Sequence, residues 1–584
     1  MLRFSRSLIR YPLPVAPTWR VGWGPESQWE GAAWQEGPLA IAVGSGRSVE
    51  SQLALSPSRR YVVVGDIWLS EQRSLLTDLA SENPSQLSDI PLDIQLIAAA
   101  WERWQTAVLP KLVGCFSLAV WDREREVLWL SRDPAGARTL YFTAQGSTRW
   151  AAGDLRSLAP YRANELDPIA LRDYLCCAFV PGDRTLWQDV RELRPGTRLI
   201  WPGDNCQPYW HLKERLEAEG REESLAWHGE RLRSHLDQVV QDCLPSQAPV
   251  GVFLSGGLDS SAVAALATKF HAHPVHTYSI HFGDPYPNEL EFSSLVAQHC
   301  GTEHHILEIP LSQMWEQLPE AMAWLDDPIG DPLTVPNLLL GQLARQQVAV
   351  VLNGEGGDPC FGGPKNQPML INQLYSSVSP QDSLQAYMLA FRKCAADLPQ
   401  LLKPELWAAV QHQPYCFAED LHSSASYLNR LMALNIKFKG ADQILTKVNN
   451  LTRAAGVEGR SPLFDQRIIE LSMVIPPQYK LSGVEEKAVL KQAVADLLPE
   501  AILKRPKSGM MVPVQAGFQR EWQRAARELL LSRQAAIAPY LNQLLIKDWL
   551  DYQGDPWRRY GVKLWLLVSL EIWLQVNQNC RRRR

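Results

Sequence analysis

Residues 252–270 read VFLSGGLDSSAVAALATKF, and this run sets the interpretation of the second half of the chain. It starts as an apolar strand-like segment, turns through two glycines, an aspartate and serines, and continues with apolar residues at helical spacing. Glycines let a backbone approach an anion closely, and the N–H groups of the turn and of the next helix then point at that anion. No lysine follows the glycines, so the run is not a Walker A loop. It predicts an anion-binding strand–turn–helix unit.

Predicted strands and helices alternate along the following hundred residues. The strands are PVGVFLSGG, PVHTYSIHF, EHHILEIP and QVAVVLNGEGGD, and helical segments follow the first two of them. Such alternation predicts a parallel, doubly wound α/β sheet that binds ligands at the carboxyl ends of its strands. After Met369 the chain is predicted to be mostly helical, and YGVKLWLLVSLEIWLQ to be a core helix.

The first half of the chain has a different pattern. YVVVGDIWL, CFSLAVWD and REREVLWLSRD are predicted strands, the last two paired as a hairpin, with a helical segment before them that starts at DIQLIAAAW. GARTLYFTAQGSTRWAAGD predicts a further pair of strands, and the whole indicates an α+β domain. The turn-rich stretch ELRPGTRLIWPGDNCQPYW is interpreted as the link. Two domains are therefore expected, residues 1–210 and 211–584.

Bulk composition excludes several classes of protein. The chain has 584 residues, 46% of them hydrophobic and 21% charged, with a net charge of -5, which is ordinary for a globular protein of two or more domains. Nothing in this balance indicates a nucleic-acid partner, and the four arginines at 581–584 are interpreted as a solvated tail. The sequence contains no apolar run long enough to predict a membrane span or a secretory signal, so a cytoplasmic location is expected. Ten cysteines without a CxxC pair argue against a disulfide framework or a zinc site.

A second glycine-rich turn, NGEGGD at residues 353–358, also follows a predicted strand. Because parallel strands end at the same edge of a sheet, Asp259 and Asp358 are expected to share a hard cation such as Mg²⁺. An ion there would draw charge from a phosphate leaving group. Two later strings, EGRSPLFD (458–465) and KRPKSGMMVP (504–513), add a carboxylate and lysines that suit a site where charge develops.

Taken together, these blocks resemble the asparagine synthetase family. The first turn is similar to its pyrophosphate loop, VVLNGEGGDPCFGG to its second loop, and GVEGRSPLFDQRIIELSMVIPPQYKL and ILKRPKSGMMVPV to later blocks, in the same order. LVGCFSLAVWDREREVLWLSRDPAGARTLYF resembles the amino-terminal glutamine amidotransferase domain of the same family. The resemblance runs from about Tyr61 to Gln575. It implies an Ntn-hydrolase-like α+β domain followed by an ATP-pyrophosphatase-type α/β synthetase domain with helical additions.

The resemblance also implies ATP-dependent amide synthesis, in which a carboxylate is adenylated, pyrophosphate leaves and an amine displaces AMP. Carried over residue by residue, the pyrophosphate would be held by Ser255, Gly256, Gly257, Asp259, Ser260 and Ser261. The adenosine would meet the backbone near Leu254, Ser279 and Gly354.

The remaining implied roles concern metal binding and catalysis. Mg²⁺ would be bound by Asp259 and Asp358. Glu355 would help deprotonate the nucleophile, with Glu458 as a weaker candidate, since an amine nucleophile at neutral pH needs a base. Lys507 would stabilise the transition states of both half-reactions, and Lys487 would contact a phosphate.

The chain departs from the family in its first half. The family uses an N-terminal cysteine after the initiator Met as nucleophile, activated by its own α-amino group, whereas position 2 here is Leu2 and the first cysteine, Cys115, is predicted to be a core thiol. In the segment similar to the glutamine-contacting NGEIYN, Val64 stands for Asn and Asp66 for Glu. We infer that the chain does not hydrolyse glutamine.

A further departure concerns the acyl substrate. Pro359 stands where the family commonly has Glu, and GGPKNQPML follows it, which brings Lys365 near the predicted site. A lost glutaminase with intact synthetase loops is similar to the β-lactam synthetases and the lasso-peptide cyclases, whose nucleophile is an amine of the substrate itself.

Three hypotheses follow from these departures. The chain is a specialised amide-forming ligase or cyclase acting on a peptide or small metabolite, an ammonia-dependent asparagine synthetase, or a non-catalytic scaffold. The scaffold is disfavoured because Asp259, Glu355, Asp358 and Lys507 are all present. The partners expected are a carboxylate and an amine, with a homodimer or a partner protein left open.

Overall fold

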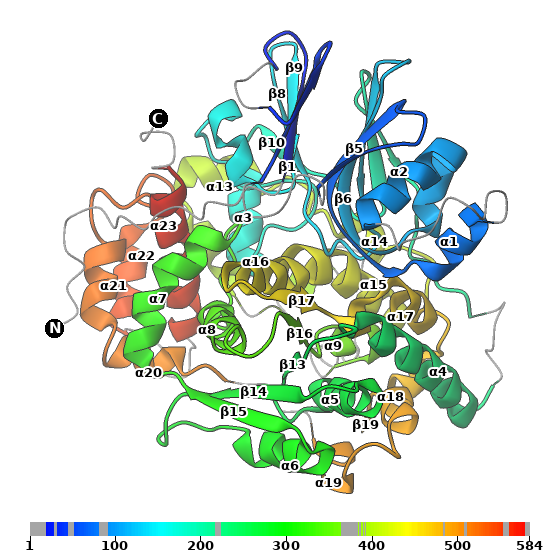
Figure 1. The fold of residues 1–584 in the computed structure, drawn as a ribbon. Coiled ribbons are helices and arrows are strands. Elements are labelled where there is room, and N and C mark those ends of the chain that lie inside the picture. Colours follow the sequence, from blue (N-terminus) through cyan, green and yellow to red (C-terminus); the bar gives the residue numbers. More distant parts are fainter. Residues whose placement is uncertain are drawn as a thin grey trace. The chain divides into compact units, whose positions relative to one another are not determined.

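The computed structural model describes residues 19–27, 32–44, 52–80, 92–216, 223–363, 393–482, 485–506, 511–552 and 560–578, together with residues 384, 387, 388 and 391. Two compact units are present. The N-terminal unit comprises Pro14–Asp167 and Gly182–Leu212, and the C-terminal unit includes Pro168–Pro181 and Lys213–Arg584 (Figure 1). The link was expected near Trp210, and the chain passes from the N-terminal to the C-terminal unit after Leu212, two residues later. Residues 168–181 also belong to the C-terminal unit. Among the described residues, no helix is long and apolar enough to cross a membrane.

The N-terminal unit contains two antiparallel sheets of six strands each. The first has the order β10-β8-β9-β1-β3-β2, built from Val190–Glu192, Tyr141–Gln145, Thr148–Ala152, Trp19–Trp23, Leu39–Val43 and Trp34–Glu36. The second has the order β12-β11-β7-β6-β5-β4, built from Asn205–Pro208, Thr197–Trp201, Val127–Arg132, Val113–Asp122, Tyr61–Glu71 and Leu53–Leu55. Helices α1 (Arg73–Ala80) and α2 (Asp93–Trp104) precede β6 in the chain.

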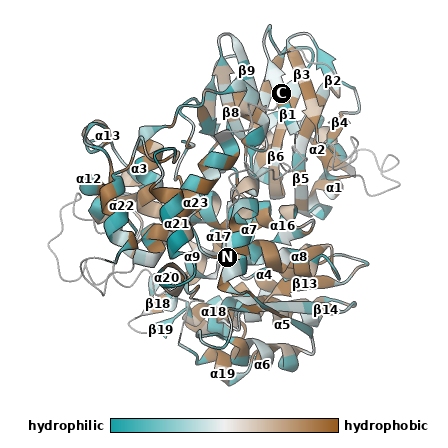
Figure 2. Cartoon of the chain, turned by 90° about the vertical axis from the view of Figure 1, so that its left-hand side faces the viewer, coloured by the Kyte–Doolittle hydropathy of each residue, from teal (hydrophilic) through white to brown (hydrophobic). Residues whose placement is uncertain are grey.

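Alternating side chains divide the core of this unit into two layers. Residues such as Trp19 and Ile41 of the first sheet pack with Val62 and Trp121 of the second. On the opposite face of the second sheet, other strand residues pack against Trp101 of α2. Period-two alternation explains both layers, because successive strand residues point to opposite faces. Figure 2 shows the hydrophobic residues of β1 and β3 in brown.

The C-terminal unit is organised around a five-stranded parallel sheet of order β15-β14-β13-β16-β17. Its strands are Glu303–Glu308, Val275–His281, Val250–Phe253, Val350–Leu352 and Glu458–Arg460. Helices α5 (Leu258–Phe270) and α6 (Leu290–Cys300) cover one face, and α8 (Thr334–Ala344) lies on the other (Figure 1). The central strands β13 and β16 are apolar throughout, as expected for strands covered on both faces, whereas the edge strands β15 and β17 carry charged residues.

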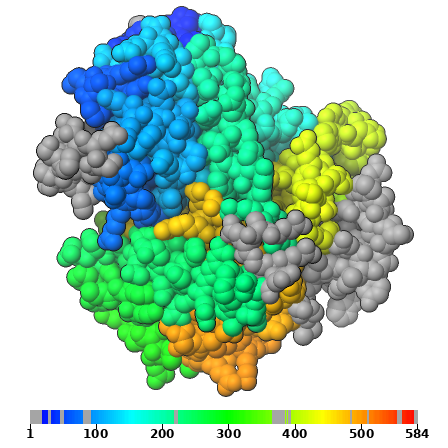
Figure 3. Space-filling view, turned by 90° about the vertical axis from the view of Figure 1, so that its right-hand side faces the viewer, coloured from blue at the N-terminus to red at the C-terminus, as the bar shows by residue number. Residues whose placement is uncertain are grey.

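Helices surround this sheet. They are α3 (Pro168–Cys177), α4 (Leu225–Cys243), α7 (Leu311–Trp324), α9 (Gly357–Phe361), α12 (Leu398–Leu401), α13 (Pro404–Val410), α14 (Ala418–Leu421), α15 (Tyr427–Leu434), α16 (Thr446–Ala454), α17 (Gln466–Ser472), α18 (Ala488–Ala493), α19 (Glu500–Leu503), α20 (Val514–Gln519), α21 (Gln523–Leu530), α22 (Gln543–Leu550) and α23 (Tyr560–Gln578). A π-helical segment, Asn435–Leu445, joins α15 to α16, and a hairpin, β18 (Leu481–Ser482) and β19 (Glu485–Glu486), precedes α18. Helix α4 lies on the surface, green in Figure 3, and packs on α18.

The predicted fold class is confirmed, and so are the four predicted strands of the parallel sheet. Helix α23 is buried along most of its length, as its apolar spacing predicted. The interpretation of residues 192–210 as a turn-rich link was wrong in part, because β11 and β12 form a hairpin there. Strands β1 to β4 and the short β17 were not predicted. Each has at most five residues, too few for periodicity to mark.

Arg172 of α3 is fully buried and anchors the segment that follows α13. Its Nη1 donates to the carbonyl oxygens of Val410 at 2.9 Å and Gln413 at 2.6 Å, and its Nη2 donates to that of Pro414 at 3.2 Å. The guanidinium also lies over the ring of Tyr415, 3.9 Å from its centroid. A planar cation with five donors suits this set of acceptors.

We expect Arg172→Ala to lower the free energy of unfolding by about 3 kcal/mol, because three carbonyl oxygens lose their donor and a buried space opens. Urea unfolding followed by circular dichroism measures the change. Arg524→Ala is the control, since the Arg524 side chain is 81% exposed in an ion pair with Glu528 and its loss should cost less than about 0.5 kcal/mol. Equal losses in the two variants would contradict the assigned role of Arg172.

Candidate active site

The first glycine-rich turn joins β13 to α5. Gly256 has φ +75°, and a Cβ there would lie 2.5 Å from the backbone nitrogen of Ser293, so only glycine fits without a shift of the backbone. The hydroxyls of Ser255 and Ser260 lie 3.1 Å apart, and the backbone N–H of Ser255 donates to the Ser260 oxygen at 3.2 Å. These bonds fix the turn at the N-terminus of α5, where the helix dipole favours an anion.

The second glycine-rich turn lies against the first. A Cβ on Gly354 would be 2.5 Å from the backbone nitrogen of Ser260, and a Cβ on Gly357 would be 2.2 Å from the carboxyl carbon of Asp259. Asn353 holds this turn in place, because its backbone N–H and its side-chain amide both donate to the carbonyl oxygen of Arg460 on β17, at 3.1 and 3.0 Å. The glycines are therefore required by the close approach of the two loops.

A buried lysine joins the two loops. Lys487 Nζ lies 2.8 and 2.6 Å from the carboxylate oxygens of Asp259, and 2.5 Å from Oδ1 of Asp358. The Lys487 side chain is only 3% exposed, and its backbone N–H donates to the carbonyl oxygen of Lys480 at 2.6 Å. The structure thus brings together three of the predicted site residues around one positive charge.

This donor set fits Mg²⁺. Asp259 and Asp358 present hard carboxylate oxygens to one point, and a magnesium site uses one or two such groups together with substrate phosphate oxygens. Gly357 and Gly363 border the two carboxylates, and a side chain at either position would collide with them. The ion, when bound, would neutralise charge on the phosphates.

Of the three residues predicted to meet adenosine, Leu254 directly follows β13, Ser279 lies within β14, and Gly354 follows β16. The backbone N–H of Leu254 donates to the carbonyl oxygen of Tyr278 at 2.8 Å, and the hydroxyl of Ser279 donates to the carbonyl oxygen of Leu254 at 2.6 Å. These groups are therefore already hydrogen-bonded to one another within the sheet. A nucleotide bound here could still donate a hydrogen bond to the second lone pair of the Leu254 carbonyl oxygen.

An arginine also supports the first loop. Arg505 Nη1 donates to the carbonyl oxygen of Gly256 at 3.0 Å, its Nη2 pairs with Glu289 at 2.5 Å, and its guanidinium lies 3.9 Å from the ring centroid of Phe292. Lys507, predicted to stabilise the transition states, and Lys365 lie outside the described residues. Arg505 therefore lies against the first glycine-rich turn.

Glu355 belongs to a second group of charges next to the loops. Burial would lower the pKa of Lys447 on α16, but the carboxylates of Asp331 and Glu355 outweigh this effect and raise it. Lys447 Nζ lies 2.6 Å from Asp331, whose own pKa falls well below its ordinary value despite burial, because of the ammonium. The backbone N–H of Glu355 donates to Asn353 Oδ1 at 3.1 Å. Lys447 thus provides a positive charge that interacts with the carboxylates of both Asp331 and Glu355.

Glu458 is less well placed than Glu355. Glu458 is the first residue of β17 and opposes Val350 of β16, whereas Arg460, the last residue of β17, opposes Leu352. Its carboxylate lies 3.1 Å from Nε of Arg460 on the same strand. An acid at that position does not follow the carboxyl end of a strand, where the loops lie.

In the N-terminal unit, the positions predicted to have lost glutamine contacts are buried. Val64 is 0% exposed and belongs to the core between the two sheets. The Asp66 carboxylate lies 3.3 Å from Nε of Arg138, and both side chains are at most 7% exposed. Cys115 pairs with Trp68 within the second sheet and is half-buried. Leu2 lies outside the described residues.

Four residues of the site were not predicted from the sequence: Arg505, Lys447, Asp331 and Lys480. Lys480 is 0% exposed, and its Nζ donates to Asn429 Oδ1 at 2.6 Å. Lys447 sits in a helix and Asp331 in a loop 116 residues earlier, so no local pattern joins them. The burial of Lys480 could have been predicted from one feature of the sequence, a lysine placed among apolar residues in PPQYKL.

Two family models match this chain. Residues 231–575 match the family described as Asparagine synthase, and residues 55–210 match Glutamine amidotransferase domain. The chain belongs to the asparagine synthase family. It is therefore an ATP-dependent carbon–nitrogen ligase with an amidotransferase-like first domain.

Two curated relatives of this asparagine synthase family member span most of the chain. "Asparagine synthetase [glutamine-hydrolyzing] 1" of Bacillus subtilis is 26% identical over 522 residues, which cover 83% of this chain and 81% of that protein. "Putative asparagine synthetase [glutamine-hydrolyzing]" of Mycobacterium tuberculosis is 28% identical over 530 residues, covering 82% and 79%. Among solved structures, glutamine PRPP amidotransferase from B. subtilis matches at 12% identity with a TM-score of 0.24, covering 63% of this chain and 86% of that one.

We expect the stability of the protein to rise with pH above 7 because of Lys480. Burial lowers the pKa of Lys480 to about 7, whereas an unfolded lysine titrates near pH 10.4. Between these values the unfolded chain holds a proton that the folded protein lacks, so the free energy of unfolding increases by up to about 1.4 kcal/mol per pH unit. Lys480→Met should remove this slope, as measured by urea unfolding between pH 7 and 9.5. Lys504→Met, whose side chain is 76% exposed, should keep it. Identical slopes in the two variants would rule out the effect.

Proposed function

We propose that this protein forms amide bonds by adenylating a carboxylate, without hydrolysing glutamine. A carboxylate oxygen attacks the α-phosphorus of ATP, the bond from that phosphorus to the bridging oxygen breaks, and pyrophosphate leaves. An amine nitrogen then attacks the acyl carbon and gives up its proton, and the carbon–oxygen bond to AMP breaks. The nucleophile that we favour is an amine of the substrate itself, as in the cyclase branches of the family.

The observation that carries this proposal is the contact of Lys487 with both Asp259 and Asp358. It joins the pyrophosphate loop to the second loop at one edge of the parallel sheet. ATP phosphates would lie against the turn at residues 255–261, and Asp259 and Asp358 would hold Mg²⁺. Glu355, next to the ammonium of Lys447, is the candidate base for the amine. Lys507 would stabilise the charge that develops as pyrophosphate and AMP leave.

The proposed loss of glutaminase activity rests on the described residues of the N-terminal unit. The position of Val64 lies in the hydrophobic core, and the carboxylate of Asp66 is paired with Arg138. Neither residue offers a free polar group to the amide or the α-carboxylate of glutamine. An amidotransferase fold can be kept while its chemistry is lost, because fold and site are separable.

Ammonia-dependent asparagine synthesis is the second candidate, since the relatives in B. subtilis and M. tuberculosis are named asparagine synthetases. It uses the same adenylating site with aspartate as the carboxylate. The two candidates differ in the carboxylate that supports the first half-reaction.

ATP–pyrophosphate exchange with Mg²⁺ tests the first half-reaction. We expect exchange to depend on an added carboxylate and to fall at least 100-fold in Asp358→Asn, because one carboxylate of the cation site is removed. Asp496→Asn is the control, since that side chain is 68% exposed and pairs with Arg233 away from the loops. Aspartate and peptides with Asp or Glu side chains are the probes.

The outcomes of this assay separate the candidates. Exchange with peptides but not with aspartate supports a specialised ligase, and exchange with aspartate supports the asparagine synthetase. Exchange with none of these carboxylates in a folded protein would refute the proposed function. Release of glutamate from glutamine by the wild-type protein would refute the loss of glutaminase activity.

Glu355→Gln tests the second half-reaction separately. We expect amide formation to fall by about 10²- to 10⁴-fold, the usual contribution of a general base, while ATP–pyrophosphate exchange stays within a few fold of wild type. Both rates are measured with the same carboxylate and with an excess of amine. Glu528→Gln, 66% exposed and paired with Arg524, is the matched control. An equal fall in both half-reactions would assign Glu355 to ATP binding instead.

A further inference from the structure

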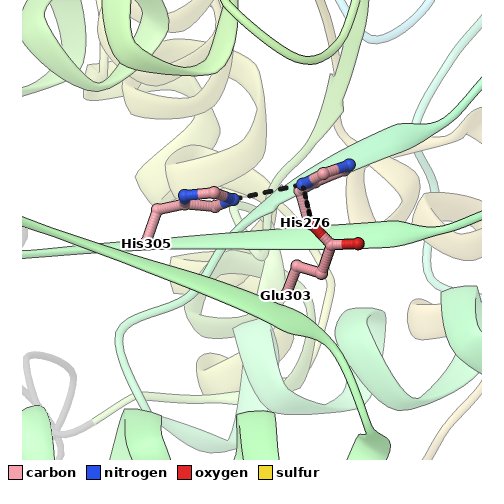
Figure 4. A group of neighbouring side chains, drawn as sticks. All are labelled: His276, Glu303 and His305. Carbon is pink, nitrogen blue, oxygen red and sulfur yellow. Dashed lines mark hydrogen bonds and ion pairs between the residues drawn. The ribbon is translucent and has the colours of Figure 1, made fainter.

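Two histidines and a glutamate lie together on one face of the parallel sheet, outside the active site. His276 is on β14, and Glu303 and His305 are on the edge strand β15 (Figure 4). Glu303 opposes His276 in the strand register, and His305 follows two residues later, so all three side chains point to the same side. They belong to the amino-terminal part of the sheet, whereas the catalytic loops follow the carboxyl ends of its strands.

The ligand atoms of these residues already converge. Nδ1 of His276 lies 3.1 Å from Nε2 of His305 and 3.5 Å from a carboxylate oxygen of Glu303, and all three ligand atoms lie within 4.8 Å of one another. In a tetrahedral zinc site with bonds of about 2.0–2.1 Å, neighbouring ligand atoms are separated by about 3.3 Å. The two spacings from Nδ1 of His276 bracket that value, and the third, between His305 and Glu303, is at most 4.8 Å.

Neighbouring residues surround the two histidines. The His276 side chain is only 10% exposed. The ring of His305 stacks on that of Tyr278, with centroids 5.0 Å apart, and the Tyr278 hydroxyl donates to Gln347 at 3.3 Å. The next residue, His304, points to the other face, where its Nδ1 lies 2.8 Å from the Thr277 hydroxyl, so it does not belong to the group. Glu303 is 63% exposed, which leaves one side of the group open to water.

We propose that His276, Glu303 and His305 bind one Zn²⁺ ion, with water as the fourth ligand, and that this ion joins the edge strand β15 to β14. Two imidazoles and a carboxylate are a zinc ligand set, whereas Mg²⁺ prefers oxygen ligands alone. The cysteine spacing gave no sign of such a site, because its ligands are histidines and a glutamate on two strands.

Zinc titration of the full-length protein tests the site. The protein is treated with chelator, desalted into buffer with Mg²⁺, and titrated with ZnCl₂ by calorimetry and by thermal unfolding. We expect wild type to bind one equivalent of Zn²⁺ with a Kd at least tenfold lower than that of the double variant His276→Asn/His305→Asn. Zinc should raise the Tm of wild type but not that of the double variant. Glu303→Gln should weaken binding by an intermediate factor.

The double variant His271→Asn/His273→Asn is the matched control. Its two histidine rings are also 5.4 Å apart, as are those of His276 and His305, and they immediately precede β14. It should bind zinc as wild type does. Thiols such as Cys206 and Cys416 are present in every variant, so any zinc bound by them cancels in the comparison.

Two further results decide the matter. Co²⁺ in place of Zn²⁺ should give visible d–d absorption of tetrahedral intensity in wild type and at least fivefold less in His276→Asn/His305→Asn. If that variant keeps the circular dichroism spectrum of wild type and binds both metals equally well, the site is refuted and the three side chains form only a hydrogen-bonded group. Neither readout depends on the ligase reaction.

Discussion

The ion pairs of Lys487 with Asp259 and Asp358 are the interaction on which the catalytic edge depends. The two aspartates come from turns about a hundred residues apart, and each turn contains glycines because the backbones nearly touch. Two carboxylates at such close range would repel one another without a cation between them. The buried ammonium removes that repulsion, and so it lets the loops of two strands form one surface, at which we propose that the phosphates and a metal ion bind.

The sequence indicated this surface because its signals are local. A glycine-rich turn between an apolar strand and a helix can be recognised within about ten residues, and two such turns in one parallel sheet must face the same edge. Lys487 was predicted as a site residue only from the resemblance to a family. Lys447, Asp331 and Arg505 could not be predicted, since each acts through a partner that is distant in the chain and is brought close only by packing.

The same reasoning explains which parts of the fold were missed. Long strands such as β5 and β6 have enough residues to display their pattern, and α23 has many buried apolar positions. The strand β17 has three residues and is a strand only because it pairs with β16. The sequence of β17 alone does not specify that pairing. The hairpin of β11 and β12 was hidden by its glycines and prolines, which mark its turns more strongly than its strands.

The buried position of Val64 and the pairing of Asp66 with Arg138 limit the substitutions that the first domain tolerates. An asparagine at position 64 would place an amide in a sealed apolar layer, at a cost of about 1–3 kcal/mol unless partners formed at the same time. Freeing Asp66 would remove one ion pair from the buried Arg138, whose guanidinium also interacts with Asp133. Either substitution alone would therefore lower the free energy of unfolding. The family's residues can be placed at positions 64 and 66 only together with changes in the side chains that surround them.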